Sequence, residues 1–133
     1  MMVTKDINTH SDIQLLVDKF YDQVMIDPEI GPVFHASIQA KDWPKHKATM
    51  VRFWESLLLR KNTYSGRPFA KHKHMPLEKR HFDKWLLLFG QTVDTHFTGS
   101  VASVAKEKAK QMALMFHSKI EHIRNNPSFR SIL

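Results

Sequence analysis

Two histidines lie in sequence contexts where an imidazole needs a partner or a function. His46 falls on an apolar helical stripe, four residues before Met50 and seven before Phe53. A buried imidazole must satisfy its ring nitrogens or face a cavity. For His46 alone, a boundary residue that reaches water or a carbonyl is the simpler interpretation. His72 precedes a strongly apolar segment in a lysine-rich loop, where a neutral imidazole can ligate a metal. An exposed loop histidine is the simpler alternative there.

The loop around His72 contains two rival metal ligands, His74 and Met75. No pair of histidines has the spacing and central glutamate of a zincin. Glycine-rich phosphate loops and Gly-x-Ser-x-Gly elbows are also absent, and acidic residues do not pair on an apolar stripe. These catalytic classes therefore have little support in the sequence.

Tyr21 and Trp85 carry polar groups on apolar helical segments, and such groups need a partner when buried. Both residue types are more often part of a core than of a functional site. Aromatic residues of the expected helices would fill a core or equally line a flat apolar cofactor pocket, and periodicity does not separate the two cases. They are Phe20, Tyr21, Phe53, Trp54, Phe82, Trp85, Phe89 and Phe116.

Composition indicates one globular domain over residues 1–133, with 42% hydrophobic and 25% charged residues. The absence of cysteine excludes disulfides, thiolate metal ligands and cofactor attachment through a Cys-x-x-Cys-His motif. It also fits a cytoplasmic protein. The net charge of +7 is compatible with nucleic acid, an acidic membrane surface or a basic soluble protein. The basic residues are scattered in small groups, and the longest apolar runs are too short to span a bilayer.

Hydrophobic periodicity predicts an all-α protein with four main helices. We expect them over residues 12–25, from after residue 42 to about residue 59, over 77–97 and over 101–124. Ser11 is the expected N-cap of the first helix, with Gln14 completing a capping box. Residues 60–75 are expected to form a loop, and the ends near 1–10 and 125–133 to be disordered or loosely attached.

An ordered series of short motifs runs along the chain. It comprises Phe20-Tyr21, Gly31-Pro32-Val33-Phe34, Trp43-x-x-His46-Lys47, Phe53-Trp54, Tyr64-Ser65-Gly66-Arg67-Pro68, His72, Pro76 and His81-Phe82-x-x-Trp85-Leu86-x-Leu88-Phe89. Each motif is weak alone, but their order and spacing are specific. The series resembles the truncated haemoglobins, specifically group III of that bacterial family, over roughly residues 16–116.

The resemblance implies a truncated globin fold, a two-over-two helical sandwich around noncovalently held haem b (iron protoporphyrin IX). It assigns His72 as the proximal iron ligand and Tyr21, His46 and Trp85 to the distal pocket that faces the gas. Whether His46 bonds the ligand, swings outward as a gate or binds iron stays open. The residues expected to contact the cofactor are Phe34, Phe53, Trp54, Tyr64, Arg67, Phe69, Lys71, Arg80, Phe82 and Phe89. Arg67, Lys71 and Arg80 are the expected partners of the haem propionates.

The leading functional hypothesis is a haem-binding globin that reversibly binds dioxygen, nitric oxide and carbon monoxide. Its task would be sensing, transport or storage, or redox chemistry such as nitric oxide oxidation or peroxide reduction with an electron donor or reductase. The expected protein is a cytoplasmic monomer or weak dimer without membrane or nucleic-acid partners. A basic helical nucleic-acid-binding domain without cofactor is the alternative, supported by charge alone. A cofactor-free helical bundle that binds a protein partner is the third hypothesis.

Overall fold

The computed structural model describes residues 4–73 and 75–126, without the side chain of Lys71. Its elements are α1 (His10–Ile26), α2 (Gly31–Ser37), the 3₁₀-helix η1 (Ala40–Asp42), α3 (Trp43–Leu58), the 3₁₀-helix η2 (Pro68–Lys71), α4 (Lys79–His96) and α5 (Ser100–Asn125). Within these ranges the only β pairing is an isolated bridge between Lys5 and Phe97. The all-α prediction is confirmed, and none of the described helices is long and apolar enough to cross a membrane.

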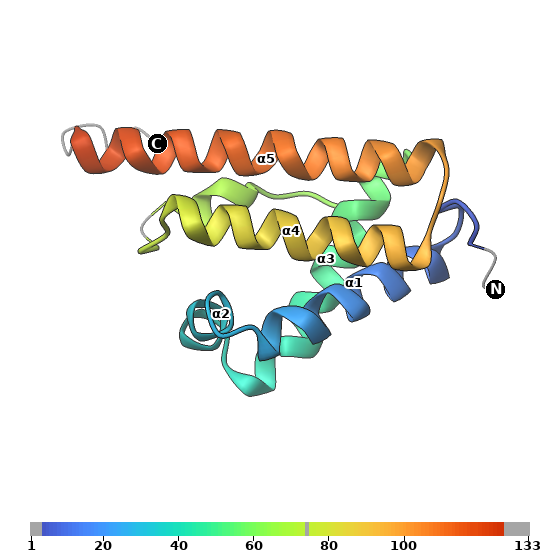
Figure 1. The fold of residues 1–133 in the computed structure, drawn as a ribbon, viewed down its shortest axis with the longest axis horizontal. Coiled ribbons are helices and arrows are strands. Elements are labelled where there is room, and N and C mark those ends of the chain that lie inside the picture. Colours follow the sequence, from blue (N-terminus) through green and yellow to red (C-terminus); the bar gives the residue numbers. More distant parts are fainter. Residues whose placement is uncertain (1–3, 74, 127–133) are drawn as a thin grey trace.

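The helices form two pairs (Figure 1). α4 and α5 run antiparallel, side by side, joined by a short turn. α1 packs against α3, against the short helix α2 and against α4, so it joins the two pairs. Because α1 contacts both α3 and α4, residues on different sides of this one helix reach different neighbours.

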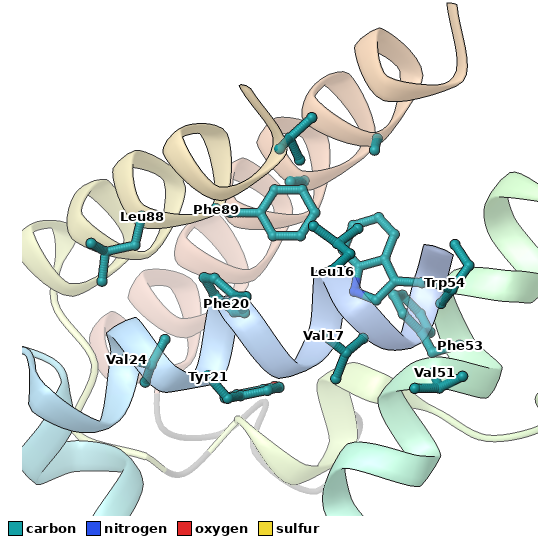
Figure 2. Packing of buried hydrophobic residues seen from close by; sticks show 14 of the residues in the cluster. Leu16, Val17, Phe20, Tyr21, Val24, Val51, Phe53, Trp54, Leu88 and Phe89 are labelled. Carbon is teal, nitrogen blue, oxygen red and sulfur yellow. The ribbon is translucent and has the colours of Figure 1, made fainter. Parts of the chain in front are cut away.

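The apolar face of α1 forms the centre of the core (Figure 2). Ile13 and Val24 are completely buried, and Leu16, Val17 and Phe20 are nearly so. Phe20 points toward α4, whereas its neighbour Tyr21 points toward α3. Successive residues of a helix are turned by about 100°, which lets adjacent side chains serve two interfaces.

The start of α1 differs from the expected one. Thr9 is the N-cap, and its hydroxyl accepts the N–H of Asp12 at 3.2 Å while the Asp12 carboxylate accepts the N–H of Thr9 at 3.0 Å. The prediction of Ser11 as N-cap with Gln14 was wrong. Aspartate here takes the place of the glutamate that the usual capping box contains, and Lys5 pairs with the same carboxylate at 2.6 Å.

Small residues let α5 approach its neighbours closely. Its buried positions include Ala102, Ala105, Ala109 and Ala113, followed by larger apolar residues nearer its C-terminus. Val101 and Met112, which the hydrophobic pattern places inward, are only half-buried. Close helix packing favours alanine at the contact line, and the larger side chains flank it.

The N-terminal segment is held more firmly than the sequence suggests. Asp6 accepts the backbone N–H groups of Val101 at 3.0 Å and Ala102 at 2.9 Å, and so caps α5 from a distant part of the chain. The N-cap of α5 itself is Gly99, at a φ of 145°, where a Cβ would strike the Asp6 carboxylate. Ile7 is fully buried. Residues 4–9 therefore differ from the expectation of a loose end, whereas residues 1–3 and 127–133 lie outside the described ranges.

We predict that Asp6→Ala lowers the free energy of unfolding by about 1–2 kcal/mol, the usual cost of losing an N-cap. Burial raises the pKa of Asp6, but the N–H groups of Val101, Ala102 and Ile7 outweigh burial and hold it below the ordinary value. The stabilisation is therefore present above about pH 4, the ordinary aspartate pKa, and is lost as the pH falls through the lower folded value.

Urea unfolding at neutral and acidic pH measures this effect. Asp22→Ala is the matched control, because Asp22 is exposed and forms no ion pair within the described part of the chain. It should change stability by less than about 0.5 kcal/mol. Equal effects of the two substitutions would contradict the capping role.

Candidate functional site

The structure brings together two of the predicted site residues, Tyr21 of α1 and His46 of α3. The Tyr21 hydroxyl and His46 Nε2 are 2.9 Å apart, and the ring centroids are 5.2 Å apart. Tyr21 is only 5% exposed, so its hydroxyl needs a partner inside the protein. The contact of α1 with α3 supplies that partner from a position 25 residues further along the chain.

Burial also fixes the charge of Tyr21. It raises the pKa of the phenol far above the ordinary value, because the phenolate would lose its hydration. Tyr21 is therefore neutral over the whole physiological range and always carries an O–H. Either atom of the pair can donate, depending on which ring nitrogen of His46 is protonated.

Two further aromatic rings enclose this pair. Trp43 lies edge-on to Tyr21 at 5.4 Å and to His46 at 5.7 Å, and Phe34 lies 5.9 Å from Tyr21. Phe34 was among the expected cofactor contacts, but Trp43 was not assigned to the site. Its position three residues before His46 places both on one side of α3, and that spacing could have identified it.

Trp85 of α4 lies one ring away from the pair. Its ring stacks on Phe89 at 5.6 Å and meets Phe20 edge-on at 5.6 Å, and Phe20 in turn contacts Tyr21 at 5.1 Å. Trp85 is half-buried, and its indole N–H has no hydrogen-bond partner among the described residues. No buried polar atom there lacks a partner, so this N–H borders accessible space.

His72 follows η2, a short helical turn within the segment expected to be loop. Its Nδ1 lies 2.6 Å from the carbonyl oxygen of Pro68. A carbonyl can only accept a hydrogen bond, so Nδ1 carries the proton, and in the neutral ring Nε2 carries the lone pair. Proline begins η2 because its missing N–H costs nothing in a first turn. The turn then places the carbonyl four residues before the imidazole.

Aromatic side chains pack around the ring of His72. The ring of Phe116, on α5, lies 5.0 Å from the imidazole, and Phe69 contacts Phe116 at 5.3 Å. Phe116 was expected only among the aromatic residues that would fill a core or line a cofactor pocket, since nothing in the sequence links it to a histidine 44 positions earlier. Of the rival ligands, Met75 donates its backbone N–H to the His72 carbonyl at 3.0 Å, and His74 lies outside the described residues.

The remaining expected cofactor contacts are distributed over the core and the proximal side. Trp54 and Phe89 stack at 4.8 Å inside the core, Phe53 meets Tyr64 at 5.2 Å, and Phe82 meets His117 at 5.5 Å. Phe69 and Arg67 line an open cavity of about 600 Å³ beside α5.

The basic residues expected near the haem propionates have different surroundings. Arg80 is engaged with Glu78 at 3.0 Å and Glu29 at 3.7 Å. Arg67 is exposed beside the cavity, and the side chain of Lys71 lies outside the described residues.

The donor set fits haem rather than a bare metal ion. Among residues 4–73 and 75–126, no group of three or more His, Asp or Glu side chains could hold a metal. Haem iron needs only one axial histidine from the protein, because the porphyrin nitrogens supply the other donors. A histidine oriented through Nδ1 by a carbonyl is the arrangement that metal-ligating imidazoles usually have.

Comparison with known proteins identifies the class of this chain. The bacterial-like globin family matches residues 4–122. The group 3 truncated hemoglobin ctb of Campylobacter jejuni subsp. jejuni is 31% identical over 122 residues, which cover 90% of this chain and 95% of that protein. The crystal structure of the group III truncated hemoglobin from Campylobacter jejuni matches with a TM-score of 0.81 at 27% identity, over 89% of this chain and 95% of that one. The chain therefore belongs to the bacterial-like globins, and its fold is a truncated globin fold.

Within that family the chain is a group III truncated haemoglobin. It is accordingly a haem-binding globin whose ligands are diatomic gases. The nucleic-acid alternative, which rested on charge alone, finds no support in these comparisons.

The burial of Tyr21 generates a prediction about its titration. The near-ultraviolet absorbance of tyrosinate should show that Tyr21 ionises only when alkali unfolds the chain, because burial raises the pKa of its phenol. Because the folded pKa of Tyr21 is raised, its contribution to stability is complete below about pH 10 and is lost as the pH rises further.

The Tyr64→Phe variant isolates Tyr21, because the chain has two tyrosines. In this variant the tyrosinate absorbance should appear only together with the loss of helical circular dichroism at high pH. Tyrosinate absorbance that appears while the helices are still folded would contradict the burial and neutrality of Tyr21.

Proposed function

We propose that this chain binds haem b noncovalently, with His72 Nε2 as the proximal iron ligand and with Tyr21, His46 and Trp85 facing the gas. The observation that carries this proposal is the 2.6 Å hydrogen bond from His72 Nδ1 to the Pro68 carbonyl. It fixes the tautomer and the ring orientation before any metal arrives, so little conformational entropy is lost on ligation.

The distal residues can act as hydrogen-bond donors to a bound gas, with the buried Tyr21 at the centre. Haem held by His72 would supply a coordination position for a diatomic gas and electron density to that gas. The Tyr21 O–H can donate to a ligand that has gained negative charge, and His46 Nε2–H can then donate to the Tyr21 oxygen at the present 2.9 Å spacing. Hydrogen bonds in a low-dielectric interior are stronger than in water. The pair therefore favours dioxygen, which gains charge, and slows its release.

Trp85 adds a second donor next to this pair. Its indole ring is held by Phe20 and Phe89, so the N–H has a fixed direction. Phe20 lies between the indole and Tyr21. Because Trp85 belongs to α4 and Tyr21 to α1, the two donors would approach a ligand from different helices. A donor network of this kind supports tight dioxygen binding and also redox use of the bound gas.

Two described side chains are expected to meet the propionates, Arg67 and Arg80, and both are exposed. Arg67 is exposed next to the cavity, whereas Arg80 already pairs with Glu78 and Glu29. We therefore assign the stronger propionate contact to Arg67. A reductase partner, a monomeric or weakly dimeric state and a cytoplasmic location stay predictions of the resemblance.

We predict that haem-loaded protein shows an intense Soret band that sharpens and shifts with carbon monoxide, and that His72→Ala loses or alters it. Added imidazole should restore the band in the variant, because the small ligand can occupy the space of the deleted ring. Absorption spectroscopy with haem titration measures both effects.

Three control variants separate His72 from its rivals. His74→Ala and Met75→Leu remove the neighbouring ligands, and His96→Ala removes a histidine from the far end of α4. All three should keep the wild-type spectrum. Loss of the band in His74→Ala with retention in His72→Ala would reassign the ligand and refute the proposal.

We predict that Tyr21→Phe speeds dioxygen release at least about tenfold, since a hydrogen bond to a charged group contributes about 1.5–3 kcal/mol. Stopped-flow displacement of dioxygen by carbon monoxide measures the rate. Thr92→Val is the matched control: it removes a buried hydroxyl that bonds the Leu88 carbonyl, away from the distal pair. An unchanged release rate in Tyr21→Phe would reject the donor role.

A further inference from the structure

A cavity of about 600 Å³, partly open to solvent, lies between the end of α3, residues 66–70 and the middle of α5. Its floor is apolar and is formed by Phe53, Leu57, Phe69, Met112 and Phe116. The volume falls within the usual range for small-molecule sites. None of Tyr21, His46, Trp85 and His72 lines it.

Three cations line the same cavity, and no acidic residue does. They are Arg67, Lys108 and Lys119. Within the described ranges none of the three forms an ion pair, although other lysines of α4 and α5 do, such as Lys106 with Asp94 at 2.7 Å. The Lys119 ammonium lies 5.0 Å from the centroid of the Phe69 ring and so sits where the apolar floor meets the charged rim.

We propose that this cavity is a second ligand site, for a fatty acid of medium chain length. The alkyl chain would cover the apolar floor, and the single carboxylate would meet Lys108 and Lys119, since Arg67 is assigned to a haem propionate. An apolar surface bordered by cations alone fits an amphiphile with one negative end, because both the exposed apolar area and the unneutralised charge are then satisfied. A neutral or cationic amphiphile would leave the charges unpaired or repelled.

This inference goes beyond gas binding, but the two sites are neighbours. Phe53, Arg67 and Phe69 are also expected haem contacts, and Phe116 contacts the ring of His72. The experiment must therefore use haem-loaded protein, so that a second site is distinguished from the haem cavity itself.

Isothermal titration of haem-loaded protein with octanoate, decanoate and dodecanoate, each below its micelle concentration, tests the site. Affinity should rise about fourfold for each added methylene, the factor expected for burying one CH₂ group. Dodecanol and dodecyltrimethylammonium should bind at least tenfold more weakly than dodecanoate. The Soret band, read in the same samples, reports haem binding separately.

Variants of α5 assign the site. Lys108→Gln and Lys119→Gln should each weaken dodecanoate about threefold, as expected for a partly exposed ion pair. Lys110→Gln is the matched control, since Lys110 is exposed on α5 and does not line the cavity. Met112→Trp should fill the floor and abolish binding, with circular dichroism showing that the helices remain.

Several results would overturn the proposal. Equal affinity for dodecanol, no dependence on chain length, or equal effects of Lys110→Gln and Lys108→Gln would each show nonspecific attraction to a basic protein. Binding to haem-free protein only, with one haem displacing one dodecanoate, would show that the cavity belongs to the haem site. A missing Soret band with intact dodecanoate binding would instead refute the haem assignment and leave the second site standing.

Discussion

Phe20 and Tyr21 are adjacent on α1, yet they serve different interfaces, and the geometry of the distal side depends on this division. Phe20 meets Trp85 and Phe89 of α4 at 5.6 and 5.3 Å, while Tyr21 meets His46 of α3 at 2.9 Å. Aromatic pairs of this kind contribute about 0.5–1.5 kcal/mol beyond the area they bury. The apolar packing of α1 on α4 therefore helps to hold Tyr21 of α1 against His46 of α3.

His72, the proposed proximal ligand, is oriented by a local interaction instead. One turn of 3₁₀-helix places the Pro68 carbonyl against His72 Nδ1, and a single ring from α5, Phe116, packs against the imidazole. The orientation of His72 therefore depends mainly on its own short segment. The proposed distal residues, in contrast, lie on three helices and come together only when those helices pack.

Much of this architecture follows from sequence patterns. Hydrophobic periodicity predicted the four main helices, and the resemblance carried by the ordered motifs assigned Tyr21 and His46 to one pocket. Long-range contacts had no such signal. The cap that Asp6 provides to α5 joins residues about 95 positions apart, and the packing of Phe116 on His72 joins a loop to the last helix. Periodicity describes one helix at a time and cannot report which carbonyl or carboxylate a distant helix will meet.

Local chemistry also explains the two errors in the predicted elements. The first capping box was misplaced because aspartate at the third helical position, Asp12, does the work that the usual pattern gives to glutamate or glutamine. The turn η2 was taken for loop because polar residues, a glycine and a proline interrupt any hydrophobic pattern in residues 60–75, although Pro68 is well suited to begin a helical turn. Trp43 was left outside the site although it lies three residues before His46 on the same helix.

A crystal structure of the haem-loaded protein with a bound diatomic gas tests the central claim most directly. The account predicts His72 Nε2 on the iron, with Nδ1 still donating to the Pro68 carbonyl, and Tyr21 and His46 together on the opposite face of the haem. Iron ligation by His74 or Met75, or Tyr21 and His72 on the same face of the haem, would contradict it.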